Sequence, residues 1–255
     1  MTTGARMMDE SPESLESRVA ALEAELAAVR AEMQDFTATV SHDLRAPLRH
    51  IVSYVQLVQE DAGPQLEPEV LGFLSTISDA ARHMGLLLDG LTALSRVGGM
   101  PMDVCPVSLQ ALVQTVREKL TEKHPQRAIE WHIADGLPTV LADTDLLYQA
   151  LTHVLGNAVK FTAPRELAKI DITAEPSASP GFVVLKVQDN GVGYNPAQQA
   201  RLFQVFGRLH SAKQFEGIGM GLAMTRKMMT LWGGSVSAQA SMDAGCCVEM
   251  QFKLA

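Results

Sequence analysis

Hydrophobic residues in the first forty positions recur in alternating steps of four and three. The series is Leu15, Val19, Leu22, Leu26, Val29, Met33, Phe36 and Val40. Neither Gly nor Pro occurs between Glu13 and Arg45. A sustained period of about 3.5 residues is typical of a coiled coil, whose seam needs a partner helix. The alternative interpretation is one amphipathic helix packed on its own domain.

A second long helix follows a break between Asp61 and Pro68, where Gly63 and two prolines interrupt the pattern. Its apolar positions again step by four and three, at Val70, Leu74, Ile77, Ala81, Met84, Leu88 and Leu91. Two long helices joined by a short loop form a helical hairpin, and two copies would form a four-helix bundle. We therefore expect a parallel homodimer.

The helical pattern stops in the stretch VGGMPMDVCP from Val97 to Pro106, which we interpret as an interdomain linker. The remainder mixes helical and strand periods. Helices are predicted at Ser108–Glu122, Asp143–Lys160 and Met220–Leu231, and strands at Ala128–Ile133, Ile170–Ala174, Phe182–Gln188, Ser235–Ala240 and Val248–Leu254. Because strands and helices do not strictly alternate, the pattern favours an α+β sandwich over a doubly wound sheet.

Four segments follow from these patterns. We expect an N-terminal coiled-coil signalling helix at 1–35, a dimerisation hairpin at 36–97, a linker at 98–107 and an α/β-sandwich domain at 108–255. The fold class is thus multidomain, α plus α+β.

Composition narrows the function classes. The chain has 255 residues, of which 47% are hydrophobic, and its formal net charge is −8, so bulk disorder and a chain-wide nucleic-acid footprint are excluded. Met1 to Asp9 has no apolar segment of a signal peptide, and no uncharged apolar run is long enough to span a membrane. Three cysteines form neither an even framework nor C-x-x-C spacing. These features favour a cytoplasmic protein without disulfides, structural zinc or a membrane span.

His42 is the first candidate for chemistry. On a helical projection it lies opposite the apolar stripe that runs from Phe36 to Val58, so we expect its ring in solvent. Asp43 is adjacent, and a carboxylate there could hold the ring N–H and accept its proton during nucleophilic attack on phosphorus. Pro47 should bend the helix just beyond.

The stretch FTATVSHDLRAPLR, from Phe36 to Arg49, resembles the H box of bacterial sensor histidine kinases, most closely that of phytochrome-like and hybrid sensors. This resemblance implies that His42 is autophosphorylated from ATP, that Asp43 is the base, and that the phosphoryl group passes to an aspartate of a response regulator. Many family members have Thr or Asn four residues after the histidine, where it supports phosphatase activity, and this chain has Ala46.

Four pieces in the second half suit a nucleotide. Asn157 and Lys160 lie on one helical face and could hold Mg²⁺ and a phosphate. Asp189 ends an apolar strand and could accept a hydrogen bond from an exocyclic amine. The other groups are the glycines of the following turn, a cation after paired aromatics, and glycines opening a helix, where free N–H groups bind anions: Gly191, Gly193, Arg208, Gly217, Gly219 and Gly221.

Taken in order, these pieces resemble the N, G1, F and G2 boxes of the GHKL-type (Bergerat) ATP-binding domain. The resemblance implies that Asn157 binds Mg²⁺, that Asp189 reads adenine, and that Arg208 and Lys160 address the phosphates. It also implies a lid between Tyr194 and Gly217. Two departures are His153, where many relatives have a second asparagine, and the altered tail Met242–Cys247. We assign no catalytic role to Cys246 or Cys247.

The sequence thus predicts an ATP- and Mg²⁺-dependent protein-histidine autokinase, active as a homodimer with a response-regulator partner and fed by a separate or deleted sensor domain. One alternative is a degenerate scaffold that dimerises and binds nucleotide without phosphotransfer. A third hypothesis, an ATPase or chaperone on the same nucleotide fold, leaves the outward-facing His-Asp pair unexplained.

Overall fold

The computed structural model describes residues 12–99, 102–211 and 214–255. The first eleven residues of the expected coiled-coil segment lie outside the described residues, as do the side chain of Leu15, two linker residues (100–101) and two residues of the expected lid (212–213). Within the described ranges, no helix combines the length and apolar character that a membrane crossing needs.

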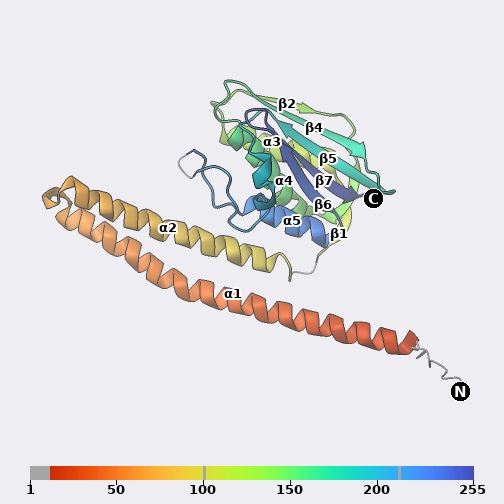
Figure 1. The fold of residues 1–255 in the computed structure, drawn as a ribbon, viewed down its shortest axis with the longest axis horizontal. Helices are drawn as coiled ribbons and strands as arrows, with labels where there is room; N and C mark the ends of the chain where they lie inside the picture. The colour runs from red at the N-terminus through yellow and green to blue at the C-terminus, as the bar shows by residue number, and fades with distance from the viewer. Residues whose placement is uncertain (1–11, 100–101, 212–213) are drawn as a thin grey trace, which may run out of the picture.

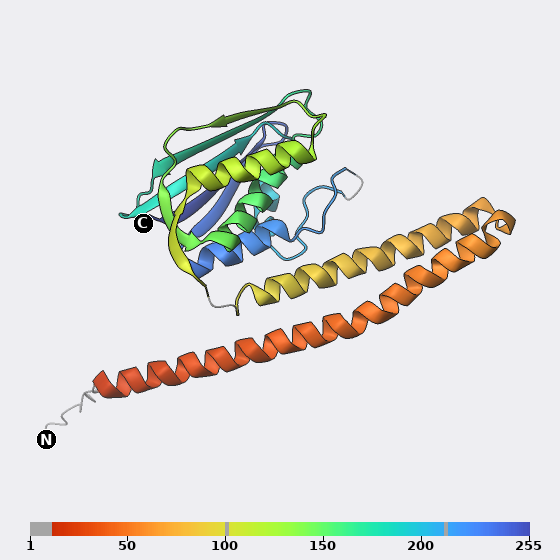
Figure 2. The ribbon, with the colours of Figure 1, turned by 180° about the vertical axis from the view of Figure 1, so that it is seen from behind.

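Two long helices form a hairpin that projects from a separate α/β domain (Figure 1). Helix α1 (Pro12–Ala62) and helix α2 (Pro68–Arg96) are joined by a 3-10 turn, η1 (Gly63–Gln65). Pro47 lies inside α1 without ending it, and α1 is curved along its length (Figure 2). Since proline has no N–H, the carbonyl of Asp43, four residues earlier, lacks its helical donor.

The hairpin buries only part of its apolar surface. Leu48 and Val55 of α1 and Ala81 of α2 are buried where the two helices pack. A second set stays exposed, on the N-terminal half of α1 and along α2: Val19, Leu22, Leu26, Val29, Met33, Val70, Phe73, Ile77, Met84 and Leu91. One copy of the chain therefore leaves much of the predicted seam uncovered.

The α/β domain has two layers, with a five-stranded sheet on one side and helices α3, α4 and α5 on the other (Figures 1 and 2). The sheet order is β2-β4-β5-β7-β6, in which only the β2–β4 pair is parallel. The elements are α3 (Leu109–Lys123), β2 (Ile129–Ile133), α4 (Thr144–Phe161), β4 (Ala168–Pro176), β5 (Phe182–Asp189), η2 (Pro196–Arg201), α5 (Gly221–Leu231), β6 (Ser235–Ala240) and β7 (Cys246–Lys253).

The core lies between these layers. Leu147, Leu151 and Leu155 repeat every four residues along α4 and are fully buried. They belong to one apolar cluster with Ile170 and Ile172, which alternate with exposed residues along β4. The period of 3.6 in the helix and of 2 in the strand thus direct both sets of side chains to one interface.

The predicted helices and strands of this domain are present with small shifts at their ends. One segment differs from expectation. Residues 104–107, placed in the linker by the sequence, belong to strand β1 (Val104–Ser108), which pairs antiparallel with β3 (Thr139–Asp143). This strand has no clear signal in the sequence, because it is only five residues long and contains Pro106. Its ladder partner lies more than thirty residues away in the chain.

Candidate functional site

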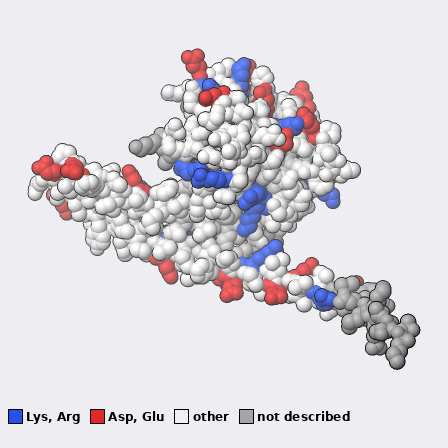
Figure 3. Space-filling view, viewed as in Figure 1, with Lys and Arg blue, Asp and Glu red and all other residues white. Residues whose placement is uncertain are grey.

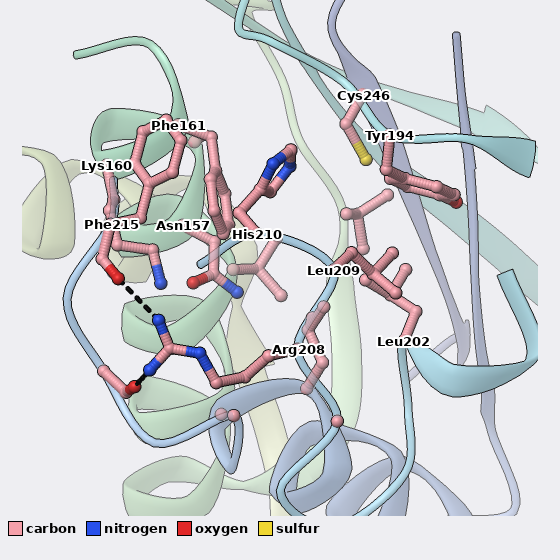
Figure 4. Close-up of a pocket in the computed structure, with 18 of the residues that line it drawn as sticks. Asn157, Lys160, Phe161, Tyr194, Leu202, Arg208, Leu209, His210, Phe215 and Cys246 are labelled. Carbon is pink, nitrogen blue, oxygen red and sulfur yellow. Dashed lines mark hydrogen bonds between the residues drawn. The ribbon is translucent and has the colours of Figure 1, made fainter. Parts of the chain in front are cut away.

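A pocket opens between α4, the end of β5 and residues 202–211 and 214–220, which we call the pocket loop (Figure 4). Eight of the nine predicted ligand-binding residues line it: Asn157, Lys160, Asp189, Gly193, Arg208, Gly217, Gly219 and Gly221. The ninth, Gly191, instead donates its backbone N–H to Asp189 Oδ1 at 2.8 Å. The structure therefore brings into one pocket residues that span 64 positions of the sequence, from Asn157 to Gly221.

Asp189 is the buried acid of the pocket. It ends strand β5 and is only 6% exposed. Burial raises the pKa of its carboxyl group to about 6, and the backbone N–H groups of Gly191 and Cys246 oppose this rise because they favour the charged form. A buried carboxylate in this position can accept a hydrogen bond from a ligand amine.

The turn after Asp189 is rigid because other backbone segments press against it. Gly193 has φ +58°, and a Cβ built there would lie 1.9 Å from Ser241 O. Gly245 has φ +86°, and its Cβ would lie 1.8 Å from Asp189 O. The altered tail identified in the sequence thus closes over the acid. Sequence reasoning gave this tail no part in the site, because only the β5–β7 pairing brings it there.

Helix α4 supplies the polar floor of the pocket. Asn157 presents a neutral amide oxygen, and the Lys160 ammonium lies 4.3 Å from the centroid of the Phe161 ring. Burial, followed by the nearby charge of Arg208, lowers the pKa of Lys160, and Glu216 partly restores it. One turn before Asn157, His153 has a lowered pKa because it is buried, and its Nδ1 is buried without a hydrogen-bond partner.

The residues at this site fit a magnesium ion that comes with its nucleotide. Within the described residues no group of three or more His, Cys, Asp or Glu side chains could hold a metal alone. Mg²⁺ is commonly held by one or two protein oxygens, substrate phosphates and water. Asn157 is the residue that would supply the protein oxygen.

The pocket loop is fastened by two side chains of its own. The Arg208 guanidinium donates to Gly217 O and, at 2.7 Å, to Phe215 O. His210 Nε2 lies 2.9 Å from Gly193 O, and since a carbonyl can only accept, this nitrogen carries the proton. The two Arg208 bonds join separate parts of the loop, and the His210 bond holds the loop against the turn that follows Asp189.

An aromatic cluster, missed by sequence reasoning, forms one wall of the pocket. The ring centroids of Phe161, His210 and Phe215 lie 5.0 to 5.4 Å apart. The His210 ring lies between the two phenylalanines on one side and Tyr194 and Cys246 on the other (Figure 4). No spacing rule signals this cluster, because it depends on how the pocket loop folds back.

Burial raises the pKa of the Cys246 thiol to about 12, so this residue at the pocket wall stays a neutral thiol.

His42 lies outside this pocket, on the hairpin. Its side chain is 83% exposed, as the apolar pattern predicts, and its Nδ1 lies 3.2 Å from Asp43 Oδ1. One turn further along α1, Arg45 Nη2 lies 2.7 Å from Asp89 Oδ1 on α2. The structure therefore presents the His-Asp pair to solvent, and the ion pair of Arg45 with Asp89 links α1 to α2 close by.

Comparison with protein families gives two matches in chain order. Residues 32–99 match the His Kinase A (phospho-acceptor) domain, and residues 142–255 match the histidine kinase-, DNA gyrase B- and HSP90-like ATPase. The two matched ranges correspond to the hairpin and to most of the α/β domain.

Among curated proteins, the chain is 32% identical over 237 residues to the methanogenesis regulatory histidine kinase FilI of Methanothrix harundinacea, a match that covers 92% of this chain and 26% of FilI. It is 31% identical to cyanobacterial phytochrome A of Nostoc sp., covering 84% of this chain and 28% of that protein. The chain thus spans about a quarter of the length of these relatives.

Among solved structures, the chain resembles full-length ShkA in complex with AMPPNP, with 27% identity, a TM-score of 0.60, and coverage of 87% of this chain and 46% of ShkA. It also shares its fold with the histidine kinase AdeS of Acinetobacter baumannii, with 18% identity, a TM-score of 0.54, and coverage of 84% of this chain and 98% of AdeS.

Proposed function

Because this chain belongs to the sensor histidine kinases with a GHKL-type ATP-binding domain, we propose that it is an ATP-dependent autokinase. It phosphorylates His42 and passes the phosphoryl group to an aspartate of a response regulator. One observation carries the proposal: an exposed imidazole, paired with a carboxylate, stands on a hairpin tethered to a pocket built around the buried Asp189.

The geometry of His42 suits nucleophilic attack. When Nδ1–H donates a hydrogen bond to Asp43 Oδ1, the neutral ring carries its free lone pair on Nε2, which points away from the carboxylate. That nitrogen attacks the γ-phosphorus as the bond from phosphorus to the β,γ-bridging oxygen breaks and ADP leaves. The Asp43 carboxylate stabilises the positive charge that develops on the ring and accepts its Nδ1 proton. Solvent exposure lets both a nucleotide and a receiver aspartate reach Nε2.

The pocket residues take complementary roles. Asp189 accepts a hydrogen bond from the exocyclic amine of adenine, and its pKa of about 6 leaves it ionised at neutral pH. Lys160 and Arg208 neutralise phosphate charge. Asn157 holds Mg²⁺, which when bound neutralises the charge on the phosphate oxygens. Positioning and charge neutralisation dominate phosphoryl transfer, so a pocket of this kind needs no nucleophile of its own.

We further propose a homodimer in which the exposed stripe of the hairpin pairs with a second copy. Because the chain spans about a quarter of its curated relatives, a sensor domain, separate or on the same polypeptide, is proposed as the source of the stimulus. The cytoplasm is the compartment that the composition and the receiver partner suggest.

Labelled ATP tests the proposal. The chain is incubated with γ-labelled ATP and Mg²⁺, and acid-labile label is measured in the parent, His42→Ala and His50→Ala, the last an exposed histidine on the same helix. We expect label in the parent and in His50→Ala and none in His42→Ala, while a fluorescent ATP analogue binds all three. Nucleotide binding without label in the parent would instead indicate the non-catalytic scaffold.

A further inference from the structure

One segment of the pocket loop faces both the pocket and the hairpin. Ile218 and Met220 line the pocket. The same two side chains lie against Gly90 of α2, where a Cβ would come within 2.8 Å of Ile218 Cδ1 and 2.9 Å of Met220 Cγ. Gly90 is buried although it lies on a helix that is otherwise largely exposed. A side chain at this position would therefore have to displace Ile218 and Met220.

The C-terminus of α2 makes a second contact with the same region. The last carbonyls of a helix need donors from beyond its end, and three of the last four here receive an N–H from the residues that follow: Ala93 from Val97, Ser95 from Gly98, and Arg96 from Gly99. The remaining carbonyl, of Leu94, accepts from Lys227 Nζ at 2.6 Å. Lys227 lies on α5, the helix that begins directly after Met220. An ammonium at a helix C-terminus also interacts favourably with the helix dipole.

These contacts form one junction. Gly90 and Leu94 are one helical turn apart on the same face of α2. Val97, which follows the helix, packs into the apolar core of the α/β domain. Lys and Arg side chains lie along the line where the hairpin meets the α/β domain (Figure 3). Gln34 of α1 donates its side-chain N–H to Ser95 O at 3.3 Å, so α1, α2 and α5 all contribute to the junction. Burial, and then the nearby charge of Arg30 on α1, lowers the pKa of Lys227.

The pocket loop cannot yield freely when it is pushed from the α2 side. Between Ile218 and Met220, Gly219 has φ +75°, and a Cβ built there would lie 2.5 Å from Gly207 O. The loop backbone is thus pressed against another part of the same loop, which also lines the pocket. A displacement of Ile218 by a side chain at position 90 would be transmitted to the pocket wall.

We propose that Gly90 is a positioning residue for the nucleotide site: it seats Ile218 and Met220 on α2, and this seat holds the pocket wall in its binding shape. Docking of the α/β domain on α2 and binding of nucleotide therefore strengthen each other. Coupling of this kind is reciprocal, since each event must change the affinity of the other by the same factor. The inference rests on the nucleotide binding of the proposed function, and not on phosphotransfer.

A pair of glycines on the same helix tests the proposal. Gly85 has nothing within 4 Å of a built Cβ, so Gly85→Leu is the matched control for Gly90→Leu. Both changes raise helix propensity alike. In the full chain, we expect the Kd of a fluorescent ATP analogue to rise about fivefold or more in Gly90→Leu. We expect it to stay near the parent value in Gly85→Leu, with a smaller rise in Gly90→Ala.

Two further measurements sharpen the test. Ile218→Val removes Cδ1, the atom nearest to a new Cβ, so adding it to Gly90→Ala should recover affinity beyond its own effect in a double-mutant cycle. In the unsubstituted chain, the ATP analogue should slow amide hydrogen exchange at the C-terminus of α2.

Equal affinities in the two leucine variants, or no nucleotide effect on α2 exchange, would overturn the coupling alone. A parent chain that binds no nucleotide would overturn both the coupling and the proposed function.

Discussion

His42 and Asp43 are consecutive residues on α1, and the imidazole Nδ1 lies 3.2 Å from the carboxylate Oδ1 while both side chains stay in solvent, 83% and 72% exposed. Neighbouring residues on a helix point in directions about 100° apart. The two side chains therefore meet because of the rotamers they adopt, and not because neighbouring residues pack against them. Within the described residues, the Asp43 carboxylate is the hydrogen-bond partner of this ring.

Asp43→Asn should slow autophosphorylation by about 100-fold, because an amide cannot accept the ring proton. The fold should be unaffected, since both side chains are exposed. The measurement is the initial rate of acid-labile labelling at saturating ATP. Asp79→Asn, an exposed aspartate on α2, is the control. A labelling rate for Asp43→Asn within threefold of the parent would mean that water serves as the base.

Nucleotide affinity should fall in mild acid because of Asp189. Burial raises its pKa to about 6, so below that pH the group becomes a neutral acid and accepts a weaker hydrogen bond from adenine. We expect the Kd of a fluorescent ATP analogue to rise by about tenfold per pH unit below pH 6. Titration between pH 5 and pH 8 measures this, and Asp189→Asn should bind weakly with no such dependence. A parent Kd that stays flat to pH 5 would argue against ionised Asp189 as the adenine acceptor.

The same carboxyl group should destabilise the folded domain at neutral pH. Its pKa is higher in the folded state than the ordinary 3.8, so its favourable contribution is complete below about pH 3.8 and is lost as pH rises through about 6. A shift of this size corresponds to roughly 3 kcal/mol. Asp189→Asn, whose amide oxygen can still accept from Gly191, should raise the free energy of unfolding at pH 8 by up to that amount. The gain should vanish near pH 4 in denaturant titrations, and a loss of stability at pH 8 would contradict it.

His210 should control nucleotide affinity through its bond to Gly193 O. His210→Phe keeps a ring beside Phe161 and Phe215 but loses the donor, whereas His210→Gln keeps a donor and loses the ring. We expect His210→Phe to raise the Kd for ATP by about fivefold, corresponding to roughly 1 kcal/mol for one hydrogen bond, and His210→Gln to recover part of the loss.

The readout for His210 includes amide exchange of the pocket loop without nucleotide, which should quicken in His210→Phe. If His210→Gln instead binds ATP more weakly than His210→Phe, then aromatic packing, and not the hydrogen bond to Gly193 O, positions the loop.

Much of this architecture follows from local patterns in the sequence. The step of four and three along α1 and α2 predicts the hairpin, and the strand β6 (Ser235–Ala240) has the predicted bounds. His42 is exposed for the reason that its helical position gives. The resemblance to the N, G1, F and G2 boxes implies one nucleotide site, and eight of the nine residues it names line one pocket.

What the sequence missed depends on contacts between distant segments. Strand β1 is recognisable only through its ladder with β3, and the closure of the tail over Asp189 only through the β5–β7 pairing. Gly90 reads as an unfavourable residue inside a helix until Ile218 and Met220 are seen against it. Gly85, on the same helix, has nothing within 4 Å of a built Cβ, so only the structure distinguishes the glycine that another element approaches from the one that none approaches.

The hairpin should dimerise through a stripe on α2 in which Val70, Ile77, Met84 and Leu91 follow one another at steps of seven residues. All four are among the exposed large hydrophobic residues, with Ile77 47% exposed. A step of seven keeps side chains on one face of a helix in a bundle.

Ile77→Glu places a charge on this face, whereas Thr76→Glu places the same charge one residue away, on an exposed position beside it. Sedimentation at micromolar concentration should show a dimer for the parent and for Thr76→Glu, and a monomer for Ile77→Glu, because burying an unpaired carboxylate in the bundle costs several kcal/mol. If the two variants sediment alike, the stripe faces something other than a second copy of the chain.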